Sequence, residues 1–199
     1  VLVDPGTYDY FSFPEWRQYF RSTRAHNTVA IDGKDQSDQL GSFLWGRRAA
    51  ARCLAWYPRD GGGKVVGEHD GYANLQDSVT CRRSLELDRE TRSLTMTDEI
   101  LSKGAHEVTL FFHFADHCEV RSASKSDHLF HVRFPGGSAI LRLDPALAVT
   151  LSTGGNAPGS GWMSRGYHRR TAASVVAATL RSQGALTLQT RLEFLQLGA

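Results

Sequence analysis

The chain has 199 residues, of which 41% are apolar and 22% are charged, a globular composition that excludes wholesale disorder. Lys and Arg number 23 against 21 Asp and Glu, and the net charge of +2 is too small to indicate a nucleic-acid-binding protein. No apolar run is long enough to span a bilayer. The three cysteines form neither a CxxC metal pair nor a dense disulfide framework.

In chain order, the first expected elements are helical turns at 15–22 and 44–54, the second of which runs into aromatic residues typical of a strand edge. Alternating apolar and polar residues then predict strands at 79–87, 93–100, 107–114, 128–134, 139–143, 175–180 and 186–192. Between the strands at 139–143 and 175–180, a Gly- and Ser-rich stretch at 152–161 is typical of a long flexible loop. We therefore expect an all-β fold, an antiparallel multi-stranded β-sandwich with few short helices, as a single domain over 1–199.

The first 45 residues hold the densest group of polar and aromatic side chains. Asp4 is expected to end one strand and His26 to open another, so a sheet edge would bring an Asp oxygen and a His nitrogen together. Those are two ligands of the kind that zinc uses, and zinc needs more than two. Each residue also has an ordinary role, because Asp4 begins a turn sequence and a histidine before a strand is commonly a hydrogen-bonded core residue.

Basic and aromatic side chains also alternate along this segment. Guanidinium groups pair with carboxylates or sulfates while aromatic rings stack on sugars, so the set suits an acidic saccharide. Nucleic acid uses the same residue types, but the nearly neutral chain has no nucleic-acid-binding motif, which ranks saccharide higher. A solvated basic face is the structural alternative. The residues concerned are Arg17, Arg21 and Arg24, with Tyr8, Tyr10, Trp16 and Tyr19.

Three later segments give weaker signals. The sequence at 67–72 gathers Glu68, His69 and Asp70, and we interpret it as a turn between strands rather than a catalytic group. His113 is flanked by bulky apolar residues and is expected on one face of a strand. Ser164 lacks a GxSxG sequence, so a hydrolase triad is not supported.

Four blocks together resemble the heparinase II/III-like family of polysaccharide lyases: 2–8 (LVDPGTY), 20–29 (FRSTRAHNTV), 32–36 (DGKDQ) and 67–72 (GEHDGY). The resemblance implies the carboxy-terminal β-sandwich, which in the family follows an α/α-toroid of helices that is absent from this chain. It also implies an acidic polysaccharide, such as heparin, heparan sulfate or alginate, cleaved by β-elimination. Because the chain opens within an apparent strand and without Met, we interpret it as a fragment. In the family the base and acid come largely from the toroid, so the resemblance implies that this chain is inactive alone.

By position, the resemblance implies that Asp4 and His26 are two of three zinc ligands, the third being an upstream His. It implies a supporting catalytic tyrosine and an arginine opposite the substrate carboxylate, with two candidates for each. Positive charge there would favour the enolate-like transition state. The implied site consists of catalytic Tyr19 and Tyr10 and substrate-binding Arg21, Arg24, Asn27 and Trp16.

The expected partners are an acidic polysaccharide and the upstream helical toroid of the same protein, with no nucleic acid and no membrane span. The resemblance also implies export to the periplasm, the cell surface or the medium. The alternative is a non-catalytic carbohydrate-binding module or a purely structural β-sandwich, which the fold alone does not separate from a lyase domain.

Overall fold

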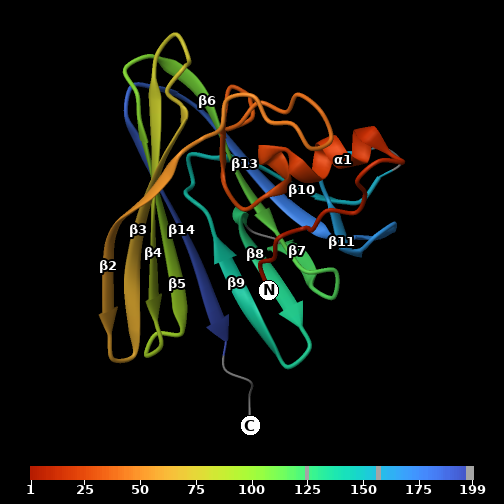
Figure 1. Cartoon of the computed structure of the whole chain (residues 1–199). Coiled ribbons are helices and arrows are strands. Elements are labelled where there is room, and N and C mark those ends of the chain that lie inside the picture. Colours follow the sequence, from red (N-terminus) through yellow and green to blue (C-terminus); the bar gives the residue numbers. More distant parts are fainter. Residues whose placement is uncertain (124–125, 156–157, 196–199) are drawn as a thin grey trace.

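Antiparallel sheets make up most of the structure, a computed structural model that describes residues 1–123, 126–155 and 158–195 (Figure 1). The larger sheet contains, in spatial order, β2 (Ala51–Arg59), β3 (Gly62–Tyr72), β4 (Val79–Asp88), β5 (Ser93–Leu101), β14 (Leu186–Leu195), β9 (Gly137–Arg142), β8 (Ser126–Phe134) and β7 (Glu119–Ala123). The smaller sheet contains β1 (Val29–Ile31), β6 (Ala105–His113), β13 (Ser174–Gln183) and β10 (Ala148–Thr153). A separate hairpin is formed by β11 (Trp162–Gly166) and β12 (Arg169–Ala172).

The core lies between the two large sheets, because alternate residues of each strand face inward. Along β6, Val108, Leu110 and Phe112 share one parity and are fully buried. They belong to one cluster with Ile100 and Leu141 of the larger sheet. This face-to-face packing confirms the expected all-β sandwich.

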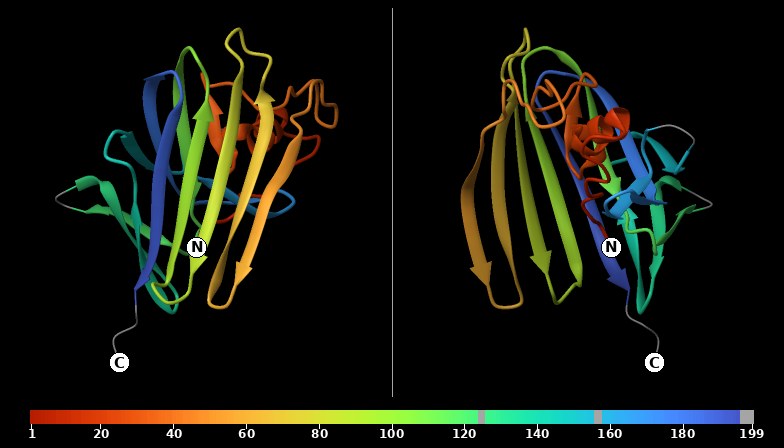
Figure 2. Two further views of the ribbon diagram at one scale, coloured as in Figure 1. Left: turned by 90° about the vertical axis from the view of Figure 1, so that its left-hand side faces the viewer. Right: turned by 45° about the vertical axis from the view of Figure 1, so that its right-hand side comes forward.

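Helix α1 (Pro14–Arg21) and the short 3-10 helix η1 (Thr23–Ala25) cover one side of the smaller sheet near β11 (Figure 2). Pro14 occupies the first turn of α1, where its missing N–H costs nothing. Trp16, Tyr19 and Phe20 stand at i, i+3 and i+4, so they form one buried face. No helix among the described residues is long and apolar enough to cross a membrane.

The predicted strands are all present, and the expected helix at 15–22 is α1. Two expectations within residues 44–72 are wrong. The window 44–54 forms no helix, since bends lead into β2 at Ala51. Residues 67–72 are not a turn but the end of β3, held by antiparallel pairing to β2 and β4 on its two sides. In the expected loop at 152–161, β10 extends to Thr153, and 156–157 lie outside the described residues.

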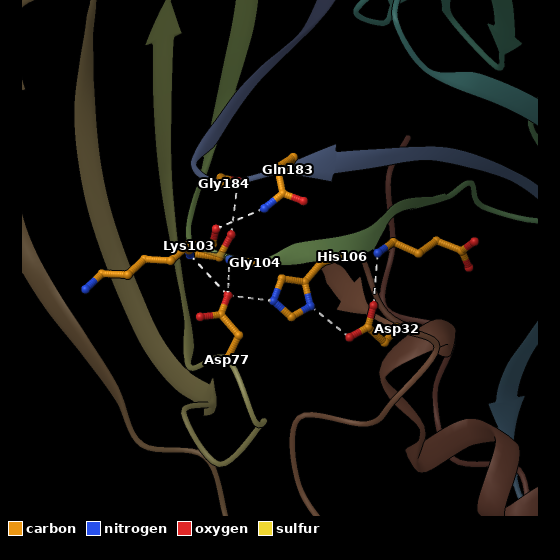
Figure 3. Close-up of polar contacts among 9 residues, drawn as sticks. Asp32, Asp77, Lys103, Gly104, His106, Gln183 and Gly184 are labelled. Carbon is orange, nitrogen blue, oxygen red and sulfur yellow. Dashed lines mark hydrogen bonds and ion pairs between the residues drawn. The ribbon is translucent and has the colours of Figure 1, made fainter.

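A buried histidine joins the two sheets at one end of the sandwich (Figure 3). His106 Nδ1 lies 2.8 Å from Oδ2 of Asp32, which follows β1. On the other side of the ring, His106 Nε2 lies 3.1 Å from Oδ2 of Asp77, in the connection between β3 and β4. Backbone N–H groups of Lys103 and Gly104 also donate to Asp77. Through these contacts His106 and Asp77 link the segment after β1, the β3–β4 connection and the β5–β6 connection.

Candidate functional site

The turn after Val3 fixes the direction of the Asp4 side chain. Val3 donates its N–H to the carbonyl oxygen of His113 at 3.0 Å, and Leu2 forms a single bridge with Phe114 in place of the expected strand. The Gly6 N–H then donates to Asp4 Oδ1 at 2.9 Å. Asp4 Oδ2 is left to face His26.

Gly6 is required at this turn for two reasons. Its φ is +85°, a conformation that L side chains rarely adopt, and a Cβ would lie 2.2 Å from the carbonyl oxygen of Ser164. We expect Gly6→Ala to lower the free energy of unfolding by about 1 kcal/mol or more in urea denaturation. Gly166→Ala is the control, since its added Cβ meets nothing within 4 Å. Equal losses in both variants would contradict this account of the turn.

The Asp4 and His26 side chains are in contact, as we expected from the sequence. His26 Nδ1 lies 2.8 Å from Asp4 Oδ2, and the side chains are 36% and 69% exposed, respectively. The carboxylate and imidazole are suitable zinc donors, but zinc sites use at least three protein ligands. Within the described ranges, no cluster of three or more His, Cys, Asp or Glu side chains is placed to hold a metal ion. These residues alone therefore do not complete a zinc site.

Asn27 holds the segments that carry this pair. Its Nδ2 donates to the carbonyl oxygen of Val3 at 2.8 Å, and its Oδ1 accepts the N–H of His113 at 2.6 Å. His113 Nε2 lies 3.0 Å from the carbonyl oxygen of Arg24, and burial lowers the pKa of His113 to about 4. His113 is therefore a neutral core residue on one face of β6, as expected, and Asn27 links β6 to the amino-terminal segment.

Two aromatic residues predicted for the site are buried instead of exposed to solvent. Trp16 packs edge-on against Trp162 with 5.4 Å between ring centroids, and the Arg170 guanidinium lies 4.0 Å from the Trp16 centroid. Tyr19 is 1% exposed, and burial raises its pKa to about 12. With this pKa the Tyr19 hydroxyl stays protonated near neutral pH, so it is poorly suited to act as a base.

The two candidate arginines differ in their surroundings. The Arg21 guanidinium donates to the carbonyl oxygen of Gly41 and lies 3.9 Å from the centroid of Trp45. Arg24 is exposed, lies 5.8 Å from the Tyr19 centroid, and lines a cavity of about 410 Å³. Polar residues of that cavity include Glu15, Gln18, Ser22, Lys34 and Asp35. Arg24 is thus the member of the pair that is open to a ligand.

Tyr10 lies 41% exposed between two aromatic residues that the sequence did not single out together. Its ring is near-parallel to that of Phe43, with centroids 5.9 Å apart, and to that of Tyr167, with centroids 6.0 Å apart. The three come from distant chain segments, so no spacing rule indicates that they meet. The one signal available in the sequence was an aromatic residue within a few positions of a glycine at each of the three places.

Comparison with known proteins gives the family. The sequence matches the heparinase II/III-like carboxy-terminal domain over residues 1–190. The chain belongs to this family. The family and the β-sandwich that the sequence blocks led us to expect are therefore confirmed. A search of curated proteins gives no match.

Solved structures show the same fold. Heparan sulfate lyase HepC from Pedobacter heparinus superposes with a TM-score of 0.77 at 11% identity, covering 100% of this chain and 29% of that one. A heparinase III, the BT4657 gene product, superposes with a TM-score of 0.75 at 20% identity, covering 98% and 28%. Another heparinase III gives 0.76 at 17% identity, covering 99% and 28%. The chain thus spans less than a third of these relatives.

Proposed function

We propose that this chain is the carboxy-terminal domain of a lyase that cleaves uronate-containing polysaccharide by β-elimination, and that it forms one wall of the substrate cleft. The family match over residues 1–190 carries the proposal. The exposed Asp4–His26 pair and the cavity beside Arg24 support a cleft on the same side of the sandwich. A helical companion domain would supply the opposite wall.

In β-elimination a base removes the proton next to the uronate carboxylate, and the electron pair expels the glycosidic oxygen, which an acid protonates. Negative charge builds on the carboxylate as the proton leaves, so a nearby cation lowers the barrier. Arg24 suits this role better than Arg21, whose guanidinium is already bonded to the Gly41 carbonyl. Tyr10 suits proton transfer better than Tyr19, which is buried.

We expect Arg24→Gln to lower turnover at least about tenfold, because a charge that stabilises the transition state is lost. Arg21→Gln is the comparison and should lower turnover less, because the Arg21 guanidinium is already bonded to the Gly41 carbonyl oxygen. The measurement is ultraviolet absorbance of the unsaturated product from heparin, heparan sulfate and alginate. It should be made on this chain and on a polypeptide that also carries the helical domain. Unchanged turnover in Arg24→Gln would remove Arg24 from the mechanism.

We also propose that Asp4 and His26 hold zinc together with a third ligand from outside the described residues. Both side chains are solvent-accessible, and each supplies a donor that zinc accepts. In the polypeptide with the helical domain, Asp4→Asn and His26→Gln should each lose zinc on dialysis, measured by elemental analysis. The exposed His131→Gln is the control. Equal zinc content in all variants would refute this assignment.

A second candidate function is a carbohydrate-binding module without catalysis. It is favoured by the exposed aromatic rings around Tyr10, which are typical of surfaces that stack on sugars. Binding of oligosaccharide without formation of unsaturated product, even with the helical domain present, would favour this function over the lyase.

Export to the periplasm, the cell surface or the medium is proposed from the family resemblance alone. Large acidic polysaccharides are encountered outside the cytoplasm, which is consistent with this location. Fractionation of cells that express the natural polypeptide would test it, and recovery only in the cytoplasmic fraction would contradict it.

A further inference from the structure

Three exposed aromatic rings form a continuous surface beside α1, here called the aromatic shelf: Tyr10, Phe43 and Tyr167. They are 41%, 57% and 53% exposed, respectively. Tyr10 lies in the middle, with 5.9 Å to the Phe43 centroid and 6.0 Å to that of Tyr167. Their interplanar angles of 10° and 20° keep the rings nearly parallel. Large aromatic groups left in water on one surface indicate a binding site.

A cation without an acidic partner adjoins the shelf. The Arg17 guanidinium lies 5.0 Å from the Tyr10 centroid and 5.5 Å from that of Phe43, and its Nε donates to the Ser42 carbonyl oxygen at 3.0 Å. Across the described part of the chain, no carboxylate forms an ion pair with Arg17 or with Arg21. Both arginines line a cleft of about 270 Å³ between α1 and the loop at 39–42. The cleft therefore has an excess of positive charge.

We propose that the aromatic shelf and Arg17 bind one acidic sugar residue of a polysaccharide. A pyranose ring would pack on the aromatic groups, and its carboxylate or sulfate would pair with the guanidinium. The phenol groups of Tyr10 and Tyr167 provide hydrogen-bonding groups at the edge of an apolar surface, which suits a ligand with many hydroxyls. The proposal takes its substrate class from the proposed function. It adds a site that shares Tyr10 with the proposed catalytic groups but includes neither Asp4 nor His26.

The charge argues for this occupant over a protein partner. An apolar protein surface placed over the shelf would bury Arg17 without a counter-charge, which costs free energy. An anionic sugar supplies the counter-charge and leaves most of its hydroxyls in water. Binding should therefore weaken as salt concentration rises.

The test is calorimetric titration of the chain with heparan sulfate, alginate and neutral cellulose tetrasaccharides. Phe43→Ala and Tyr167→Ala should each weaken binding of an acidic tetrasaccharide about tenfold, through loss of stacking area. Arg17→Gln should weaken it by a similar factor at low salt and by less at high salt. Trp56→Ala is the matched aromatic control, because Trp56 is 67% exposed on edge strand β2. Arg89→Gln is the charge control.

Losses in the shelf variants with unchanged binding in the controls would support the site. The inference is overturned if the shelf variants bind as the unmodified chain does, if the controls lose as much, if cellulose binds equally well, or if no tetrasaccharide binds at millimolar concentration. The lyase assay is scored separately. A negative lyase assay with shelf-dependent binding would refute the lyase and keep the shelf, whereas the reverse pattern would keep the lyase and refute the shelf.

Discussion

Replacing Arg83 with Met is expected to lower the free energy of unfolding by about 3–5 kcal/mol, because it leaves a buried carboxylate without its partner. Arg83 Nε lies 2.7 Å from Asp98 Oδ1, and Nη2 lies 3.0 Å from Asp98 Oδ2. Asp98 is 2% exposed, so water cannot replace the two hydrogen bonds. Equilibrium unfolding in urea measures the loss.

Arg59→Met is the matched control on the same sheet. Arg59 pairs with Glu86 at 3.2 Å, but its side chain is 50% exposed, so the expected loss is below about 1 kcal/mol. The Arg83 side chain also donates from Nη1 to the Asn27 carbonyl oxygen at 2.6 Å. Loss of that bond frees the segment next to His26, so Arg83→Met should also weaken any ligand held there. Similar losses in both variants would show that burial does not set the strength of the pair.

The strands could be predicted because a half-buried strand repeats every two residues, and that period is local to the sequence. The helix at 14–21 was predictable for a similar reason, since Trp16, Tyr19 and Phe20 repeat with the period of a helix. The contact between Asp4 and His26 followed from their positions beside two pairing segments of the chain. The strands and the helix are therefore encoded in short stretches of sequence, whereas the Asp4–His26 contact also depends on both segments lying beside β6.

Contacts between distant segments were not predictable in this way. Tyr19 looked like an exposed site residue, but packing of α1 against Trp162 of the β11–β12 hairpin buries it. Phe43 and Tyr167 lie 124 positions apart, and only the tertiary fold places both beside Tyr10. The segment 67–72 has turn-forming residues, yet pairing on two sides keeps it extended.

The contact of His106 with two carboxylates should make stability depend on pH at both ends of the range. A neutral imidazole donates from one nitrogen only, so hydrogen bonds to both Asp32 and Asp77 require the protonated ring. Burial alone would lower the pKa of His106, but the hydrogen bonds and charges of the two carboxylates outweigh it and raise the pKa above 6.5. The ring is then cationic in the folded protein at mildly acidic pH.

The carboxylates shift in the opposite direction. Backbone donation from Gly104 and the bond to His106 lower the pKa of Asp77. For Asp32, burial raises the pKa, but the bond to His106 and the N–H of Glu107 together lower it below 3.8. The histidine contribution is complete below about pH 6.5 and is lost as pH rises through its folded pKa. The carboxylate contribution is present above about pH 4 and is lost as pH falls through their folded pKa values.

His106→Ala should therefore lower Tm by about 8 °C at pH 5.5, where two charge-assisted hydrogen bonds are intact, and by less at pH 8.5. His106→Gln keeps much of the volume and hydrogen bonding but does not titrate, so its Tm should change less between these pH values than that of the unmodified chain. His117→Ala is the control, since His117 is 48% exposed and lies 3.7 Å from its nearest acidic partner. A Tm difference between His106→Ala and the unmodified chain that is the same at both pH values would mean that packing, and not the charged bridge, is what His106 contributes. Since Asp32 directly follows β1, loss of the bridge should also loosen the strand that follows His26 and Asn27.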